Sequence, residues 1–257
     1  MLLTVDIGNT QTAIGLFDGE RLVAHWALTT RSEDTADEVH LNLAGQFMLS
    51  EYELEDVDDV VVASVVPTLT GCWCQVARRV AGKDPIVVGP SIEAGLPMHY
   101  DNPAEIGADR IADALGAVEL EGAPVIVVDL GTATNIEVVD ETGAFRGGLI
   151  APGLGTSARD LASHAAQLSL VDLSFPAHVV GTNTKDAMRS GLMWGEVARI
   201  DGLVRLVFEE LGYEAPVIAT GGYANVMAQR SDTVTRHEPN LTLQGLRIIY
   251  ERNKTGK

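Results

Sequence analysis

The sequence has few cysteines and a shortage of basic residues. Its two cysteines, Cys72 and Cys74, are separated by one residue. Two cysteines without a second pair do not build the usual four-ligand zinc site, and this spacing suits a disulfide poorly. We therefore expect two buried or half-buried thiols. Lysine and arginine total 18 against 36 acidic residues, giving a net charge of −18. Such an acidic surface repels nucleic acids and anionic membranes, so we predict neither as a partner.

Long apolar runs are also missing. Runs such as 60–66 and 125–128 are far shorter than a membrane-spanning helix requires. The first ten residues lack the basic start and apolar stretch of a secretory signal, so we expect a cytoplasmic protein. With 257 residues, 46% of them hydrophobic, the chain can form one large globular domain or two of roughly 120 residues.

Periodicity predicts alternating strands and helices. Strands are expected at 2–6, 12–17, 21–28, 60–66, 85–88, 124–129, 136–139 and 145–150, and a further strand runs into Gly221-Gly222. Helices are expected at 35–48, 69–80 and 108–120. Asp18-Gly19 predicts a turn between strands. The chain is therefore predicted to be an α/β protein.

One pattern occurs twice. Val5-Asp6-Ile7-Gly8 matches Val128-Asp129-Leu130-Gly131, and small polar residues and a strand follow each copy. Two copies indicate a duplicated α/β fold, because a solenoid needs at least three repeats. The connector at 119–124 suggests an N-terminal half at 1–118 and a C-terminal half at 119–257.

Each copy has the composition of a phosphate-binding turn. Glycine lets backbone N–H groups approach an anion closely, while an aspartate at the strand end can hold a metal ion. The first copy adds Asn9, Thr10 and Thr12, and the second adds Thr132 and Thr134. An ordinary hairpin would explain one copy, but two equivalent copies favour a triphosphate held between facing loops. Neither a Walker loop nor a G-x-G-x-x-G after a strand is present, so a nucleotide would have to bind through these hairpins.

Further polar segments precede predicted helices. Gly107 leads into a helix whose first turn carries Asp109 and Arg110. The carboxylate could accept a proton from an alcohol and the guanidinium could bind a substrate carboxylate. The alternative is an acid that only stabilises the helix start beside an exposed arginine. Thr156 or Ser157, and separately Thr184, are predicted helix caps, and Thr184 could instead contact a ligand.

Nine segments together resemble the type III pantothenate kinase family. They are DIGNT at 6–10, TADE at 35–38, SVVP at 64–67, YDNPAEIGADR at 100–110, VVDLGTAT at 127–134, GGLIAPG at 147–153, NT at 183–184, ATGG at 219–222 and LTLQGL at 241–246. They occur in the family's order and cover almost the whole chain. The YDNP–GADR block is the most specific, since the wider sugar-kinase/actin superfamily lacks it.

The resemblance implies a duplicated ribonuclease-H-like fold of the actin/sugar-kinase type, with two similar halves around a central cleft. It implies phosphorylation of pantothenate to 4'-phosphopantothenate by ATP, the first step of coenzyme A biosynthesis. Mg²⁺ would accompany ATP, with a monovalent cation, K⁺ or NH₄⁺. The family is dimeric, which implies a homodimer formed through the C-terminal half.

The resemblance also implies roles for particular residues. Asp109 would be the catalytic base. The nucleotide would be bound by Asp6, Ile7, Gly8, Asn9, Thr10, Gln11, Thr12, Ala13 and Thr132, with Mg²⁺ near Asp6. Pantothenate would be bound by Tyr100, Gly107, Ala108, Asp109, Arg110 and Thr184, the last reaching the neighbouring subunit's site. Asp129 would bind the monovalent cation.

Two positions depart from the family pattern. Asn135-Ile136-Glu137 replaces the frequent T-F-D, and Thr182 stands where a basic residue often precedes the NT pair. Neither change removes a proposed catalytic group. Two alternatives remain open: a kinase for another small hydroxyl substrate, and a non-catalytic nucleotide-binding accessory factor.

Overall fold

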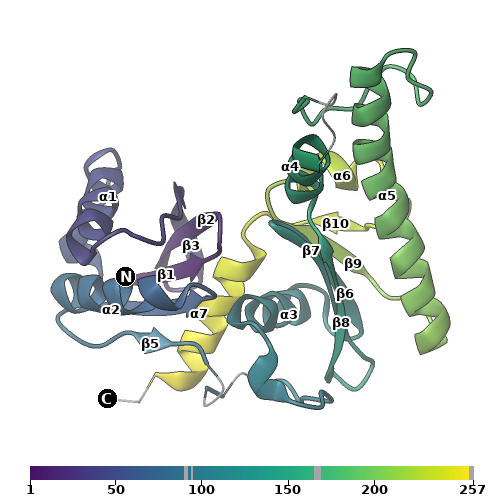
Figure 1. Ribbon diagram of the computed structural model, residues 1–257. Coiled ribbons are helices and arrows are strands. Elements are labelled where there is room, and N and C mark those ends of the chain that lie inside the picture. Colours follow the sequence, from purple (N-terminus) through teal and green to yellow (C-terminus); the bar gives the residue numbers. More distant parts are fainter. Residues whose placement is uncertain (90–91, 94, 165–168, 255–257) are drawn as a thin grey trace. The chain divides into compact units, whose positions relative to one another are not determined.

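The computed structural model describes residues 1–89, 92–93, 95–164 and 169–254. The chain divides into two compact units (Figure 1). The first contains Met1–Leu120 and Asn240–Lys257, and the second contains Glu121–Pro239. No helix in the described part of the chain combines the length and apolar character that a membrane crossing needs.

The first unit is built on a five-stranded sheet in the order β3-β2-β1-β4-β5. Its strands are β1 (Leu2–Ile7), β2 (Gln11–Asp18), β3 (Arg21–Thr29), β4 (Asp59–Ser64) and β5 (Ile86–Val87). The first three strands form an antiparallel meander, while β4 is parallel to β1 and β5 is parallel to β4. The apolar run of β1 is thus central in the sheet, and its buried side chains help to form the core.

Local signals set the ends of the helices in this unit. Helix α1 (Ala36–Met48) begins at Thr35, whose side chain and that of Glu38 form a capping box. Helix α2 (Pro67–Ala81) begins with proline and ends at Gly82, whose φ of 70° is left-handed. The remaining elements are the short 3-10 helices η1 (Leu54–Asp56) and η2 (Pro103–Glu105), and helices α3 (Ala108–Glu121) and α7 (Leu241–Asn253). The predicted helices at 35–48, 69–80 and 108–120 are confirmed within two residues at each end.

The C-terminal helix α7 groups with the first unit, whereas the sequence-based boundary assigned it to the second half. Glycines explain the difference, because they let α7 lie very close to α3. A Cβ at Gly245 would lie 1.8 Å from the carbonyl oxygen of Ala112. The Thr242 hydroxyl also donates to Asp113 of α3 at 2.6 Å. These contacts join segments that are more than 100 residues apart, which sequence order did not indicate.

The second unit repeats the topology of the first. Its strands are β6 (Val125–Leu130), β7 (Ala133–Val139), β8 (Phe145–Pro152), β9 (Val217–Thr220) and β10 (Arg236–His237), in the order β10-β9-β6-β7-β8. Strands β6 to β8 form the antiparallel meander, while β9 is parallel to β6 and β10 to β9. The predicted duplication is therefore confirmed. Strand β7 begins at Ala133, three residues earlier than expected.

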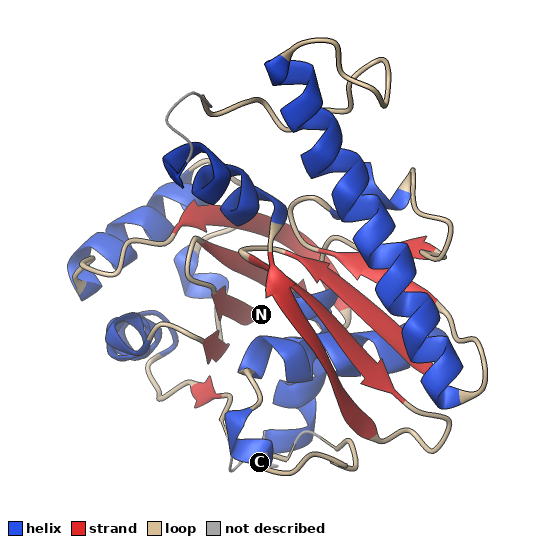
Figure 2. Ribbon diagram, turned by 45° about the vertical axis from the view of Figure 1, so that its right-hand side comes forward, coloured by secondary structure: helices blue, strands red, loops and turns tan. Residues whose placement is uncertain are grey.

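Helices α4 (Leu154–His164), α5 (Thr184–Leu211) and α6 (Ala224–Ala228) complete the second unit. The 28-residue α5 runs along its sheet (Figure 2). Its apolar side chains pack with Ile126, Val128 and Leu130 of β6 in one core cluster. This packing gives α5 a fixed position beside the strand that ends at Asp129 and Leu130.

Two predicted helix caps were wrong. Helix α4 begins at Leu154, so Thr156 and Ser157 lie inside it, and the carbonyl of Gly153 accepts from Ser157 N–H at 2.8 Å. The cap of α5 is Asn183, whose side chain accepts from Asp186 N–H at 2.9 Å. Thr184 is the first residue of that helix and is not its cap.

Candidate functional site

The first repeat forms a tight turn between β1 and β2. Asp6 stands near the end of β1, opposite Ala13, with its side chain half-buried. The turn closes through a hydrogen bond from Gly8 N–H to the carbonyl of Gln11 at 3.0 Å. Asn9 and Thr10 at its tip are exposed. A carboxylate therefore stands beside an accessible polar turn, as phosphate and metal binding would require.

A neighbouring strand supports this first turn. The Thr10 carbonyl accepts from Thr30 N–H at 3.0 Å, and the hydroxyls of Thr12 and Thr30 lie 2.8 Å apart. Thr12 is 3% exposed. Its hydroxyl therefore helps to hold the base of the hairpin, whereas Asn9, Thr10 and Gln11 remain exposed to solvent.

The predicted base lies in the first turn of α3. The Gly107 carbonyl accepts from Ile111 N–H at 3.2 Å, so helical hydrogen bonding begins there. The half-buried Asp109 carboxylate accepts from Arg110 N–H at 2.9 Å. It lies directly over Gly107, where a Cβ would be 2.3 Å from its Oδ1. Glycine at 107 therefore leaves room for the carboxylate at the positive end of the helix.

Arg110 is 7% exposed, so the alternative of an exposed neighbouring arginine does not hold. The preceding segment is ordered by its own polar groups: Asn102 donates to the Glu105 carboxylate at 2.7 Å. Tyr100, before it, is half-buried. The YDNP–GADR block is thus an ordered segment that leads into the start of α3.

The second repeat forms the corresponding turn between β6 and β7. Asp129 stands opposite Asn135 and Leu130 opposite Thr134. Gly131 N–H donates to the carbonyl of Ala133 at 3.0 Å. This turn is thus one residue shorter than the first. In both hairpins the paired strands continue for one residue beyond the aspartate.

Close backbone packing surrounds the second turn. The Thr132 carbonyl accepts from Gly153 N–H at 3.1 Å and from the Thr156 hydroxyl at 2.8 Å. A Cβ at Gly153 would lie 2.4 Å from the Gly131 carbonyl oxygen, and one at Gly221 would lie 2.5 Å from Asp129 Oδ1. The two glycine-rich segments singled out in the sequence therefore adjoin this turn, which sequence reasoning did not predict.

The structure distributes the predicted site residues over both units. Those at 6–13, Tyr100 and Gly107–Arg110 belong to the first unit, and Asp129, Thr132 and Thr184 belong to the second. Within the described residues, no group of three or more His, Cys, Asp or Glu side chains forms a metal cluster. Cys72 and Cys74 are free and half-buried, as predicted.

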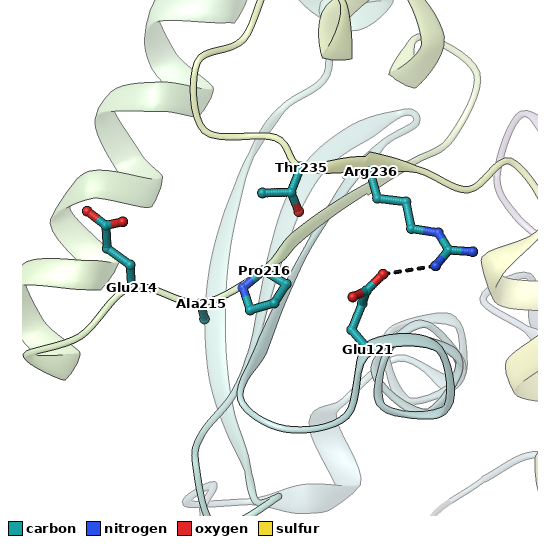
Figure 3. Close-up of a pocket in the computed structure, with 6 residues that line it drawn as sticks. All are labelled: Glu121, Glu214, Ala215, Pro216, Thr235 and Arg236. Carbon is teal, nitrogen blue, oxygen red and sulfur yellow. Dashed lines mark hydrogen bonds and ion pairs between the residues drawn. The ribbon is translucent and has the colours of Figure 1, made fainter.

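A depression of about 450 Å³ lies elsewhere in the second unit (Figure 3). Pro216, just before β9, lines it together with Arg236 and Glu121. It is therefore at the opposite end of β9 from Gly221. Arg236 pairs with Glu121 at 2.9 Å and lies 3.9 Å from Glu238, so its charge is already balanced. We therefore assign no anion to this depression.

Comparisons with known proteins agree with the geometry of the hairpins. The model of the type III pantothenate kinase family matches residues 2–206. A Type III pantothenate kinase from Roseiflexus castenholzii is 46% identical over 254 residues, covering 99% of this chain and 100% of the relative.

Solved structures establish the fold. A ROK hexokinase from Thermus thermophilus is similar with a TM-score of 0.53 at 15% identity, over 99% of each chain. A candidate Baf family transcriptional activator from Campylobacter jejuni has a TM-score of 0.59 at 20% identity, over 98% of each chain. The duplicated actin/sugar-kinase-type fold is therefore confirmed. Together with the family match over most of the sequence, this shows that the chain belongs to the type III pantothenate kinase family.

Proposed function

We propose that this protein transfers the γ-phosphoryl group of ATP to the hydroxyl of pantothenate, forming 4'-phosphopantothenate for coenzyme A biosynthesis. The family match over residues 2–206 carries the proposal, because that range contains all of the proposed site residues. The two aspartate-glycine hairpins at the ends of β1 and β6 would bind the nucleotide in place of a Walker loop.

Asp109 is the proposed general base. Its carboxylate is half-buried at the start of α3 and accepts from the backbone of Arg110. It would take the hydroxyl proton as the hydroxyl oxygen bonds to the γ-phosphorus and the bond to the ADP oxygen breaks. The transition state of phosphoryl transfer is loose, so orientation of the hydroxyl contributes more than strong deprotonation.

Pantothenate is assigned to the segment that precedes and begins α3. Tyr100, Gly107, Ala108 and Arg110 would bind it together with Asp109, and a guanidinium suits its carboxylate. Thr184 would complete the pocket from the start of α5, reaching the site of a second subunit in a homodimer. The exposed position of Thr184, with the capping role taken by Asn183, is compatible with a ligand contact.

The nucleotide is assigned to the two hairpins. Residues 6–13 and Thr132 would bind its phosphates, mainly through backbone N–H groups. Mg²⁺ bound with ATP would be held near Asp6, whose half-buried carboxylate at a strand end is the hard oxygen ligand this ion prefers. When bound, Mg²⁺ neutralises phosphate charge, which matters in a protein with a net charge of −18.

A monovalent cation, K⁺ or NH₄⁺, is assigned to Asp129. That carboxylate packs closely against Gly221, where a Cβ would lie 2.5 Å from Oδ1, so the absence of a side chain at 221 leaves room for it. Oxygen ligands of this kind suit a hard cation.

The test is an ATP-consumption assay with and without pantothenate, with Mg²⁺ in potassium buffer and then in sodium buffer. We expect ADP formation that depends on pantothenate and is faster in potassium. A panel of sugars and acetate serves as the control. Turnover with one of these acceptors and none with pantothenate would contradict the proposed substrate, and no turnover with any acceptor would favour an accessory role.

A further inference from the structure

A charged pair interrupts the buried face of α5. Glu196 lies among Met193, Val197 and Ile200, which are all buried, and its side chain is only 4% exposed. Arg199 follows three residues later on the same side of the helix and forms an ion pair with it. An apolar residue at 196 would have continued the core, so the position of this carboxylate calls for an explanation.

Both side chains bind to the base of the second hairpin. The Thr134 hydroxyl donates to Glu196 Oε1 at 2.7 Å. Arg199 Nη2 lies 3.2 Å from the same hydroxyl and donates to the Pro152 carbonyl at 2.7 Å. Thr134 is 2% exposed and the Glu196 side chain 4%, so the hydrogen bond between them is shielded from water, whereas the Arg199 side chain is 27% exposed. Hydrogen bonds to charged groups in such surroundings fix geometry strongly.

The two anchored points, Thr134 and Pro152, lie at the adjoining ends of β7 and β8, next to the turn that contains Thr132. Thr134 is two residues after Thr132 in the chain, and Pro152 is followed by Gly153, whose N–H donates to the Thr132 carbonyl at 3.1 Å. The ends of β7 and β8 are thus held to α5 at the place where they meet Thr132.

We propose that Glu196 and Arg199 are positioning residues that hold Thr132 in the orientation that binds the nucleotide phosphates. This rests on the proposed assignment of Thr132 to ATP. Stability alone does not account for the pair, because replacing a buried ion pair by apolar residues is often neutral or stabilising. The need to hold the turn at Thr132 in one position does account for the pair, since small displacements of binding groups reduce affinity and rate.

The decisive variant is the double substitution Glu196→Leu with Arg199→Met. It removes both charges together, so no buried charge is left without its partner. We expect the melting temperature to fall by only a few degrees, because the buried Thr134 hydroxyl loses its acceptor, while the KM for ATP rises roughly 10- to 100-fold. The KM for pantothenate should change less than twofold, a split that a purely structural role would not produce.

Arg205→Met is the matched control. Arg205 is on the same helix and pairs with Asp232 at 3.1 Å, but both side chains are more than half exposed. Its removal should leave the KM for ATP unchanged. If the double variant also keeps the wild-type KM for ATP, the proposal is wrong.

If the double variant does not fold, the pair Thr134→Ser and Thr134→Val decides. The serine keeps the hydroxyl that Glu196 binds and should retain the affinity for ATP, whereas the valine should lose about tenfold. Equal affinities would overturn the proposal. Calorimetric binding of an ATP analogue gives the same comparison without turnover, so failure of pantothenate phosphorylation would be recognised separately.

Discussion

In both hairpins the strand pairing ends one residue after the aspartate, but the turns differ in length. In both, the aspartate is followed by an apolar residue that pairs across the ladder with a buried threonine, Thr12 or Thr134. Four residues separate the paired positions in the first hairpin and three in the second, by the registers Ile7↔Thr12 and Leu130↔Thr134. Duplication has therefore kept the position of the acid and changed the loop.

Their supports differ more than their turns. The first hairpin is held by Thr30, directly beyond the adjacent strand β3 of the same meander. The second is held by Glu196 and Arg199, more than 60 residues along the chain on α5. The first hairpin should therefore be a largely local structure, whereas the second should depend on the packing of a distant helix.

The largest effect is expected at a residue outside both hairpins. Asp109→Asn keeps the size of the side chain but removes the proton acceptor, so kcat should fall by roughly 10²- to 10⁴-fold. Binding of an ATP analogue should be unchanged, because the hairpins are intact, and the melting temperature should fall only slightly, because the start of α3 loses one negative charge. Steady-state kinetics check the first expectation and calorimetry the second. Unchanged turnover would show that Asp109 is not the base.

The next largest effect should distinguish the cations that Asp6 and Asp129 bind. Asp6→Asn should raise the Mg²⁺ concentration needed for half-maximal activity by about tenfold, equivalent to ~1.4 kcal/mol. Asp129→Asn should instead reduce the advantage of potassium over sodium. Titrating Mg²⁺ and the monovalent cations with each variant tests this. The same response from both variants would mean that the hairpins do not divide the cations in this way.

A smaller effect should distinguish the packing of the turns. A Cβ at Gly153 would lie 2.4 Å from the Gly131 carbonyl oxygen, whereas one at Gly8 would lie 3.0 Å from that of Gln11. Gly153→Ala should therefore cost about 1–3 kcal/mol of unfolding free energy and raise the KM for ATP. Gly8→Ala should cost less. Denaturant unfolding of both variants measures the difference, and a greater loss from Gly8→Ala would contradict it.

The smallest effect concerns the anchoring of α5. Burial acts to raise the pKa of Asp201, but hydrogen bonds from Ser231, Asp232 and Thr233 outweigh it and hold the pKa below its usual value. Because the folded-state pKa is the lower one, this stabilisation is present above the unfolded-state pKa and is lost as pH falls through the folded-state pKa.

Asp201→Asn should therefore lower stability at neutral pH and flatten the acid limb of stability against pH. Thermal unfolding between neutral and acidic pH measures this. Asp232→Asn is the control, because the side chain of Asp232 is 81% exposed. An acid limb as steep in Asp201→Asn as in the wild type would contradict the assignment.

The sequence predicted the features that depend on local pattern. Apolar runs located the main strands, and the repeated Val-Asp-x-Gly predicted the duplication because each copy ends a central strand in the same way. The start of α3 at Ala108 followed from helical spacing and Gly107.

Features that depend on long-range packing could not be predicted. Nothing in the sequence indicates that Gly245 packs against Ala112, although this glycine lets α7 approach α3 closely. Glu196 and Arg199 look like an ordinary surface pair at i and i+3, and only the buried neighbours of Glu196 show otherwise. The cap at Asn183 was missed because Thr184, next to it, is an equally good capping residue by type.

The proposed mechanism requires both hairpins to bind one nucleotide. A crystal structure of the protein with Mg²⁺ and a non-hydrolysable ATP analogue tests this directly. We predict that backbone N–H groups of residues 8–12 and of Thr132 contact the same triphosphate, with the Asp109 carboxylate facing its γ-phosphate. A triphosphate bound by only one hairpin, or far from Asp109, would contradict the account.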